Sequence, residues 1–171
     1  YFSFGAVSAL HHTGIVDFIC FGSESGEIDE LAKIADVLVS EPEEFKHILK
    51  NHLDSGVSFA KARSNAIAEF LDSDSAALHY SNNILGIEYL KALRKLNSDI
   101  KPMTIKRIGA GYNDTEIHSK YSSATAIRKL INNGIMHNDY LSSELHDLVP
   151  EEGRDILLNE ISNGRTVTLK R

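Results

Sequence analysis

The side chains in this sequence best suited to bind an anion lie where a helical pattern begins. Ser122, Ser123 and Thr125 stand directly before or within its first turn, and Arg128 and Lys129 follow within two turns. The first turn of a helix has backbone N–H groups without intrahelical partners, and the helix dipole favours negative charge there. Hydroxyls and these amides can hold phosphate oxygens, while the planar guanidinium of Arg128 can bind the same phosphates at two points. The same pattern is also typical of an ordinary Ser or Thr N-cap.

A second group of candidates stands at the ends of two apolar segments. Residues 15–21 are a continuous apolar run broken only by Asp17, which predicts a buried strand of a parallel sheet. Residues 101–108 alternate and are β-branched, which predicts a second strand. Open α/β sheets bind ligands beyond the carboxyl ends of their strands. We therefore expect Gly22, at the end of the first strand, and Arg107, near the end of the second, at a binding edge.

Helical patterns precede, separate and follow the two predicted strands. One helix opens the chain and is stopped by Thr13-Gly14, and two short helices meet near Pro150. Three helices separate the first strand from a further helix that begins with a Ser or Asn cap at residues 81–83, and they suggest a lid or a helical subdomain. The periodic segments are 28–39, 41–55 and 58–71. Polar loops are predicted over 72–80 and 109–120, and an extended end over 166–169. The fold class is therefore α/β, a parallel sheet with inserted and C-terminal helices.

Length and composition favour one well-formed core. The chain has 171 residues, of which 42% are apolar, enough for one core and a small helical appendage. No apolar run approaches the roughly 20 residues that span a bilayer, and no signal-peptide pattern opens the sequence. Cys20 is the only cysteine, so we expect a buried, inert thiol, and a metal site would need His and carboxylates. Together these features predict a cytoplasmic protein.

The charge is unevenly distributed. The formal net charge is −6, yet residues 91–129 contain nine Lys and Arg against three Asp and Glu. A basic segment in an acidic chain is compatible with a polyphosphate or RNA partner, although a solvated helix surface explains Lys91, Arg94 and Lys95 at least as well. The candidates for RNA contact are Lys101, Lys106 and Lys129.

Four motifs stand in one order along the chain: Phe21-Gly22-Ser23-Glu24, Asn82-Asn83-Ile84-Leu85-Gly86, Ile105-Lys106-Arg107-Ile108 and Tyr121-Ser122-Ser123-Ala124-Thr125-Ala126-Ile127-Arg128. With them the sequence resembles the tRNA(Met) cytidine acetate ligases, a branch of the HxGH nucleotidyltransferase superfamily, along most of its length. The resemblance implies a Rossmann-like, HUP-type parallel sheet. Residues 1–135 would then form a partial nucleotidyltransferase-like domain with a helical insertion at about 28–72, and residues 136–171 the start of a C-terminal helical region.

The resemblance also implies an activity. Enzymes of this family activate acetate with ATP, giving acetyl-adenylate and pyrophosphate, and then acetylate N4 of the wobble cytidine in elongator tRNA(Met). Gly22, Asn82 and Arg107 match ATP-contacting positions of the family, and the 122–128 segment matches its triphosphate-binding motif. Arg107 and Arg128 would serve catalysis by neutralising charge on the leaving pyrophosphate. The sequence leaves open whether Asn82 or its neighbour at 83 faces the nucleotide.

Mg²⁺ is expected with ATP, although the sequence shows no dedicated carboxylate cage for it. Asp114 and Glu116 are the acids near the phosphate motif that can help to position the ion. Glu24 can either contact ribose or cap the helix that follows it, and the cap is the preferred interpretation.

One departure from the family pattern limits this hypothesis. The HxGH motif is absent, and His11-His12 is not followed by Gly-His. The resemblance therefore implies that the first strand and its catalytic histidines belong to an N-terminal part of the same protein outside this chain. We expect little or no ligase activity from the chain alone. Two alternatives stay open: an adenylyltransferase acting on a phosphorylated metabolite, and a non-catalytic nucleotide- or RNA-binding module.

Overall fold

The computed structural model describes residues 2–73, 75–108, 116–117, 122–137 and 145–165. The chain divides into two compact units, Tyr1–Arg107 and Ile108–Arg171, which are described separately. The C-terminal region expected from residue 136 begins inside a helix of the second unit. The assignment of residues 108–135 to the nucleotidyltransferase-like domain therefore stays a prediction.

The first unit contains the two parallel strands that the sequence predicts. Strand β1 (Phe18–Ser23) pairs with β2 (Lys101–Lys106) in parallel, with Phe18 opposite Lys101 and Ser23 opposite Lys106. The ladder extends at both ends, because the Lys101 amide donates to the Asp17 carbonyl at 2.9 Å and the Arg107 amide to the Ser23 carbonyl at 2.8 Å. β1 begins three residues after the start of the apolar run, since the strand extends only where β2 supplies partners.

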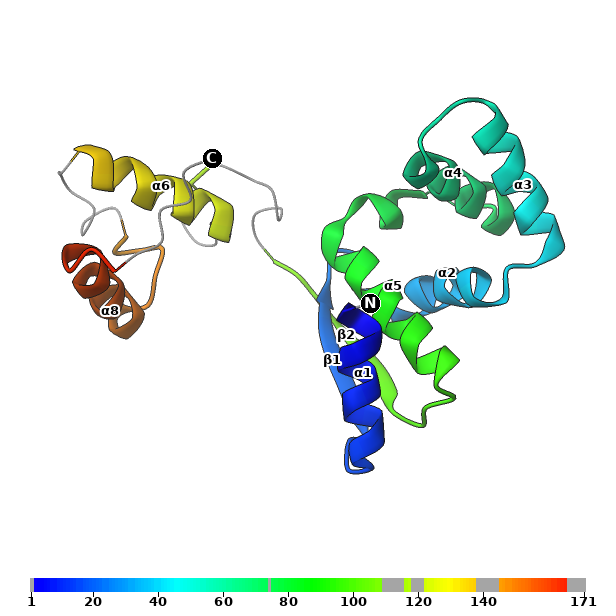
Figure 1. The fold of residues 1–171 in the computed structure, drawn as a ribbon, viewed down its shortest axis with the longest axis horizontal. Coiled ribbons are helices and arrows are strands. Elements are labelled where there is room, and N and C mark those ends of the chain that lie inside the picture. Colours follow the sequence, from blue (N-terminus) through cyan, green and yellow to red (C-terminus); the bar gives the residue numbers. More distant parts are fainter. Residues whose placement is uncertain (1, 74, 109–115, 118–121, 138–144, 166–171) are drawn as a thin grey trace. The chain divides into compact units, whose positions relative to one another are not determined.

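The helices of this unit lie close to where the periodicity places them (Figure 1). The segment expected to be a polar loop at 72–80 contains a short 3-10 helix, which the sequence did not indicate. The elements are α1 (Phe2–Thr13), α2 (Ile28–Ser40), α3 (Glu43–Asp54), α4 (Phe59–Leu71), η1 (Ser75–His79) and α5 (Ser81–Lys95). α3 and α4 pack against each other as a helical hairpin, and α5 packs against α1, α2 and β1.

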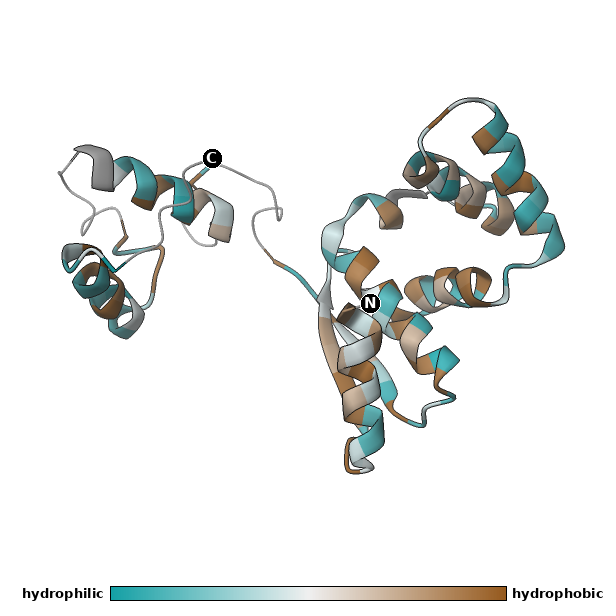
Figure 2. Ribbon diagram, viewed as in Figure 1, coloured by the Kyte–Doolittle hydropathy of each residue, from teal (hydrophilic) through white to brown (hydrophobic). Residues whose placement is uncertain are grey.

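Helix α5 is central to the core of the first unit. Its Ile87, Leu90 and Leu93 are buried in one apolar cluster with Leu31 of α2 and Val7 of α1. Along α2 and α5 hydrophobic and hydrophilic residues alternate around the helix (Figure 2), as expected for helices with one face in a core. Because α5 packs against α1, α2 and β1, this core fixes the start of α5 at residue 81 relative to the end of β1.

A glycine sets the distance between α5 and the sheet. Gly86 is buried on α5, and a Cβ there would collide with the ring of Phe21 on β1. The same ring packs against Tyr89 with a centroid separation of 5.8 Å. Gly86 is therefore required by close packing between helix and strand, which explains the glycine of the Asn82–Gly86 motif.

The two faces of the sheet are covered unequally within the described residues. Side chains alternate along each strand, so Phe21 faces α5 while Phe18, Cys20, Met103 and Ile105 share the other face. Phe18 is 56% exposed and Ile105 66%, and Cys20 is also exposed. The prediction of a buried Cys20 is wrong, because a continuous apolar run does not reveal which face of a strand another element covers.

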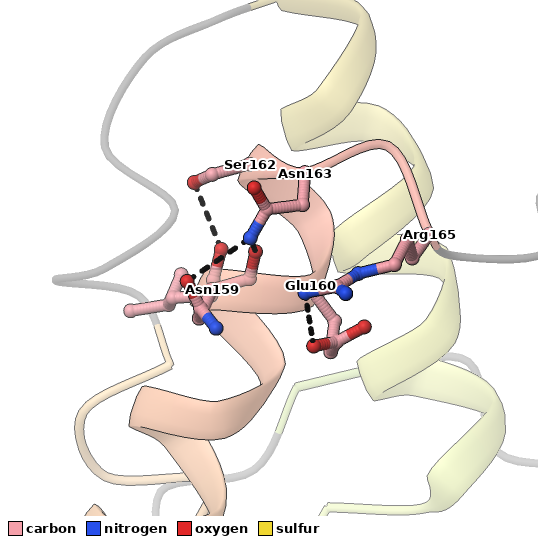
Figure 3. A network of polar contacts seen from close by, with 6 residues as sticks. Asn159, Glu160, Ser162, Asn163 and Arg165 are labelled. Carbon is pink, nitrogen blue, oxygen red and sulfur yellow. Dashed lines mark hydrogen bonds and ion pairs between the residues drawn. The ribbon is translucent and has the colours of Figure 1, made fainter.

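The second unit contains two described helices, α6 (Ala124–His137) and α8 (Glu151–Ser162). Pro150 is the N-cap residue of α8, as the predicted junction near residue 150 requires. Contacts in its last turn close α8 (Figure 3): Asn163 Nδ2 donates to the Asn159 carbonyl at 2.7 Å, and Arg165 pairs with Glu160 at 2.9 Å. The expected extended end at 166–169, and most of the loop at 109–120 and of the first short helix, lie outside the described residues. Within the described residues, no helix is long and apolar enough to cross a membrane.

We expect Gly86→Ala to lower the free energy of unfolding by about 1–3 kcal/mol, because overpacking displaces the ring of Phe21. Urea unfolding followed by circular dichroism measures the change. Gly5→Ala is the matched control: it lies in α1, and an added Cβ there meets no atom within 4 Å. It should be neutral or stabilising by up to about 1 kcal/mol. Equal or greater stability of the Gly86 variant would contradict the packing argument.

Candidate functional site

The carboxyl ends of β1 and β2 bring two predicted site residues together. Gly22 lies on β1 and Arg107 directly follows β2. A Cβ at Gly22 would lie 3.3 Å from Arg107 Cγ and 3.7 Å from Cδ, so the arginine stem passes close over the glycine. Gly22 thus lets an exposed cation lie against the strand end, and the edge can attract an anion.

Hydrogen bonds fasten the loop after β1 to β2. The Gly26 amide donates to Ser23 Oγ at 3.0 Å, Ser23 Oγ lies 2.7 Å from Thr104 Oγ1, and Thr104 Oγ1 donates to the Phe21 carbonyl at 3.0 Å. Because the Thr104 proton goes to a carbonyl, Ser23 must donate to Thr104 and accept from Gly26. Gly26 has φ +74°, and a Cβ there would lie only 2.7 Å from Lys106 Cβ. This turn therefore requires glycine.

Glu24 caps α5, the helix that begins 57 residues later in the sequence. Its Oε1 accepts from Asn82 Nδ2 at 2.6 Å and from the Asn82 amide at 3.3 Å, and its Oε2 accepts from the Asn83 amide at 2.9 Å. A carboxylate at a helix N-terminus satisfies free N–H groups and complements the dipole. The preferred interpretation that Glu24 caps the next helix is wrong: α2 has no side-chain cap bond at its N-cap, Glu27. α5 likewise has no side-chain cap bond from its own N-cap residue.

Asn83 of α5 accepts hydrogen bonds from the backbone of the loop after β1. Its Oδ1 accepts from the Glu24 amide at 2.8 Å and from the Ser25 amide at 3.2 Å, and its side chain is fully buried. Within the described residues, its Nδ2 is buried without a hydrogen-bond partner. Asn83 therefore maintains the loop conformation, whereas Asn82 is only partly buried.

Two opposing effects act on the pKa of Glu24. Burial raises it, but hydrogen bonds from the Asn82 side chain and from the backbone amides of Asn83, Asn82 and Glu24 itself lower it. The net effect is a pKa below the ordinary value of a glutamate. Glu24 is therefore ionised at neutral pH and acts only as an acceptor.

In the second unit, the hydroxyl-rich segment forms the start of α6. Ser123 Oγ accepts from the Ala126 amide at 2.9 Å, and the Ser123 carbonyl accepts from the Ile127 amide at 3.0 Å. Ser123 is thus a helix N-cap, as one of the two interpretations expects. Arg128 is exposed, and its Nη2 donates to Thr125 Oγ1 at 3.3 Å. The predicted residues Ser123, Thr125 and Arg128 therefore share the first turns of one helix, with Ser122 directly before it.

The basic segment contains two kinds of cation. Lys91 pairs with Glu88 at 2.7 Å and is partly buried, whereas Arg94 pairs with Asp36 at 2.7 Å and is exposed, as the solvated-surface interpretation expects. The lysines predicted to contact RNA, Lys101, Lys106 and Lys129, are all exposed. The Lys101 ammonium lies 5.8 Å from the centroid of the Phe18 ring.

The described residues offer little to hold a metal ion. They contain no group of three or more His, Cys, Asp or Glu side chains that could bind one. Of the two acids considered for Mg²⁺, Glu116 is exposed, and Asp114 lies outside the described residues.

Comparison with known proteins identifies the family. The model of the family described as HIGH Nucleotidyl Transferase matches residues 1–171, the whole chain. The chain belongs to the HIGH nucleotidyl transferase family. This confirms the superfamily that the four motifs indicate, although the histidine motif itself does not occur in these residues.

Two relatives of this HIGH nucleotidyl transferase chain are named tRNA(Met) cytidine acetate ligase. The protein from Clostridium novyi is 45% identical over 98% of the chain and 41% of its own length. The protein from Clostridium botulinum (strain Langeland) is 50% identical over 90% of the chain and 38% of its own length. The suspected resemblance to these ligases is confirmed, and the chain spans about two fifths of the curated relatives it matches.

Solved structures confirm the expected nucleotidyltransferase fold. The apo crystal structure of Thermotoga maritima TmcAL has a TM-score of 0.83 and 37% identity, covering 98% of this chain and 40% of that one. A second crystal form of the same protein, bound with alpha-thio ATP, has a TM-score of 0.76 and 36% identity, covering 96% and 37%.

We expect Glu24→Gln to lower the free energy of unfolding at pH 7 by about 1–2 kcal/mol, since a glutamine cannot accept at both terminal atoms. The folded-state pKa is lowered, so the stabilisation is present above the ordinary value near 4.5 and is lost as the pH falls through the folded-state value. Urea unfolding at pH 7 and pH 3 measures both effects. Glu44→Gln, an exposed position in α3, is the control. An equal difference from the parent protein at both pH values would contradict the cap.

Proposed function

We propose that the protein containing this chain is an ATP-dependent ligase that activates acetate as acetyl-adenylate and acetylates N4 of the wobble cytidine of elongator tRNA(Met). The observation that carries this proposal is 45–50% identity, over 90% or more of the chain, to proteins named tRNA(Met) cytidine acetate ligase. A homologous protein was crystallised with bound alpha-thio ATP, which supports ATP as the nucleotide substrate. The proposed function places the protein in the cytoplasm, where tRNA and ATP are available.

The proposed reaction has two steps. An acetate oxygen attacks the α-phosphorus of ATP, the bond to the bridging oxygen breaks, and pyrophosphate leaves. The cytidine N4 amine then attacks the acetyl carbonyl carbon, AMP leaves, and the amine loses a proton. In the first step negative charge accumulates on the leaving pyrophosphate, so positioned cations and helix amides lower the barrier.

The residues of this chain supply such groups. In the proposed function Gly22, Asn82 and Arg107 bind ATP at the strand ends, supported by the close approach of the arginine stem to the glycine. Asn82 is preferred over its neighbour, because Asn83 is fully buried and holds the loop. The first turns of α6 supply the remaining predicted ATP contacts, namely Ser122, Ser123, Thr125 and Arg128. The exposed Lys101, Lys106 and Lys129 are available for tRNA.

Mg²⁺ normally accompanies ATP and is held mainly by phosphate oxygens and water, with one or two carboxylates. The described residues contain no cluster of potential ligands and thus no cage of their own. The ion would neutralise part of the triphosphate charge, and Arg107 and Arg128 would act on the remainder.

The exposed face of the sheet supports the proposal that another part of the same protein packs against it. Parallel sheets are normally covered on both faces, yet Phe18, Cys20, Met103 and Ile105 are exposed within the described part of the chain. The relatives are more than twice as long as this chain. In the proposed function the N-terminal part of the same protein, with the histidine motif, covers this face and completes the ATP site.

Acetate-dependent exchange of labelled pyrophosphate into ATP by the full-length protein tests the proposed activity. Exchange that requires acetate, followed by acetylation of the wobble cytidine of tRNA(Met), is the expected result. An adenylyltransferase acting on a phosphorylated metabolite would show no response to acetate, and a non-catalytic module would show no exchange. The 171-residue chain alone should show little or none.

In the full-length protein, Arg107→Ala and Arg128→Ala should each reduce kcat/KM for acetyl-adenylate formation. The expected loss is about 2–4 kcal/mol of transition-state stabilisation, the scale for a preorganised charged contact. Lys95→Ala, at an exposed position in α5, is the control and should change the rate far less. Normal acetyl-adenylate formation by both arginine variants would overturn the assignment.

A further inference from the structure

We propose that Glu24 is a positioning residue that orients the Asn82 amide, so that Asn82 Oδ1 accepts a hydrogen bond from the bound nucleotide. This inference rests on the proposed ATP site and adds a determinant of nucleotide selectivity to it. The nucleotide group it recognises is an N–H or O–H donor, either the 6-amino group of adenine or a ribose hydroxyl.

The orientation of the Asn82 amide follows from the chemistry of its partner. Amide oxygen and nitrogen are usually distinguished only by their hydrogen-bond network. Here the group 2.6 Å from Asn82 is Glu24 Oε1, and an ionised carboxylate only accepts. The NH₂ group must therefore face Glu24. Oδ1 is the other polar atom of the amide, and within the described residues it has no hydrogen bond.

The carboxylate that imposes this orientation is itself held at several points. Glu24 also accepts from the amides of Asn82 and Asn83, and its own amide donates to Asn83 Oδ1. Ser25 donates to the same Oδ1, which holds the next residue of the loop. Turning the Asn82 amide over would place two acceptors against each other at 2.6 Å. The network therefore presents an acceptor and disfavours presentation of a donor.

The position of this acceptor matches the proposed site. Glu24 follows β1 by one residue, and Gly22, two residues earlier, lies beneath the Arg107 side chain. Asn82 stands in the first turn of α5 and is partly buried, so it is less enclosed than its fully buried neighbour Asn83. An acceptor near an arginine suits a nucleotide: the cation binds phosphate, and the acceptor binds a donor on the base or ribose.

Analogues of ATP separate the two donors. ITP replaces the 6-amino group by a carbonyl oxygen, which would face Oδ1 as a second acceptor. The 2′-deoxy and 3′-deoxy forms of ATP each remove one ribose hydroxyl. We expect the parent protein to prefer ATP over at least one analogue by about tenfold or more, the scale of one lost hydrogen bond with its unpaired partner. Loss against ITP identifies the base, and loss against a deoxy form identifies the ribose.

The experiment measures kcat/KM in acetate-dependent pyrophosphate exchange by the full-length protein, and Kd for each nucleotide by calorimetry. Glu24→Gln should reduce the ATP preference about tenfold, because a glutamine can accept or donate and lets the Asn82 amide turn over. Asn82→Ala should reduce the same preference. Glu24→Asp, which keeps a carboxylate, should retain more of the ATP preference than Glu24→Gln does. Glu44→Gln, outside the network, should leave it unchanged. General destabilisation of the protein lowers the affinity for all nucleotides together and does not alter the ratio between ATP and its analogues.

Two results would overturn the inference. One is equal affinity of the parent protein for ATP and every analogue; the other is a preference that stays unchanged in either the Glu24→Gln or the Asn82→Ala variant. Either result leaves the proposed ligase standing if acetate-dependent exchange is observed. Absence of exchange in the parent protein would instead reject the ligase, while calorimetry still decides the role of Glu24.

Discussion

The first unit depends on a reciprocal exchange of hydrogen bonds between the loop after β1 and the first turn of α5. Glu24 accepts from the start of the helix, and Asn83 accepts from the backbone of the loop. Each partner satisfies groups that the other element leaves without intrahelical or ladder partners. Because a buried group left without a partner is costly, the loop and the helix hold each other in one arrangement.

This exchange is effective only because the core brings α5 close to the sheet. Gly86 allows the Phe21 ring to lie against the helix, and Ile87, Leu90 and Leu93 bury the same helix against α1 and α2. A side chain at position 86 would move the start of α5 away from the loop. The apolar packing and the polar contacts thus specify the same position for α5, and that consistency favours a single conformation for the edge that carries Gly22 and Arg107.

The sheet has a polar end, one packed face and one exposed face within the described residues. Ser23 and Thr104 fix the polar end through a chain of hydroxyls, so the turn at Gly26 lies close to Lys106. The exposed face carries Phe18, Cys20, Met103 and Ile105, which have the apolar character of an interior. In a family whose curated relatives are more than twice as long, such a face is consistent with packing against another part of the protein.

Local patterns were sufficient to predict most elements of the first unit. Apolar periodicity located α2 to α5, and β-branched alternation located β2. The order of four motifs was enough to recognise the family, and the N-cap at Ser123 was one of two interpretations of its segment. The helices, the strand and the cap depend on neighbours within a few residues, and the motifs and their order can be read directly along the chain.

What the sequence by itself determined is therefore most of the elements of the first unit, the parallel pairing of its strands and the family. Only the tertiary structure decided that Glu24 caps α5 rather than α2, that Asn83 is buried, and that Cys20 lies on the exposed face of the sheet. Each of these depends on which distant segment comes within hydrogen-bond or van der Waals distance. Periodicity shows that a residue can be buried or paired, but only packing among α5, β1 and β2 selects its partner.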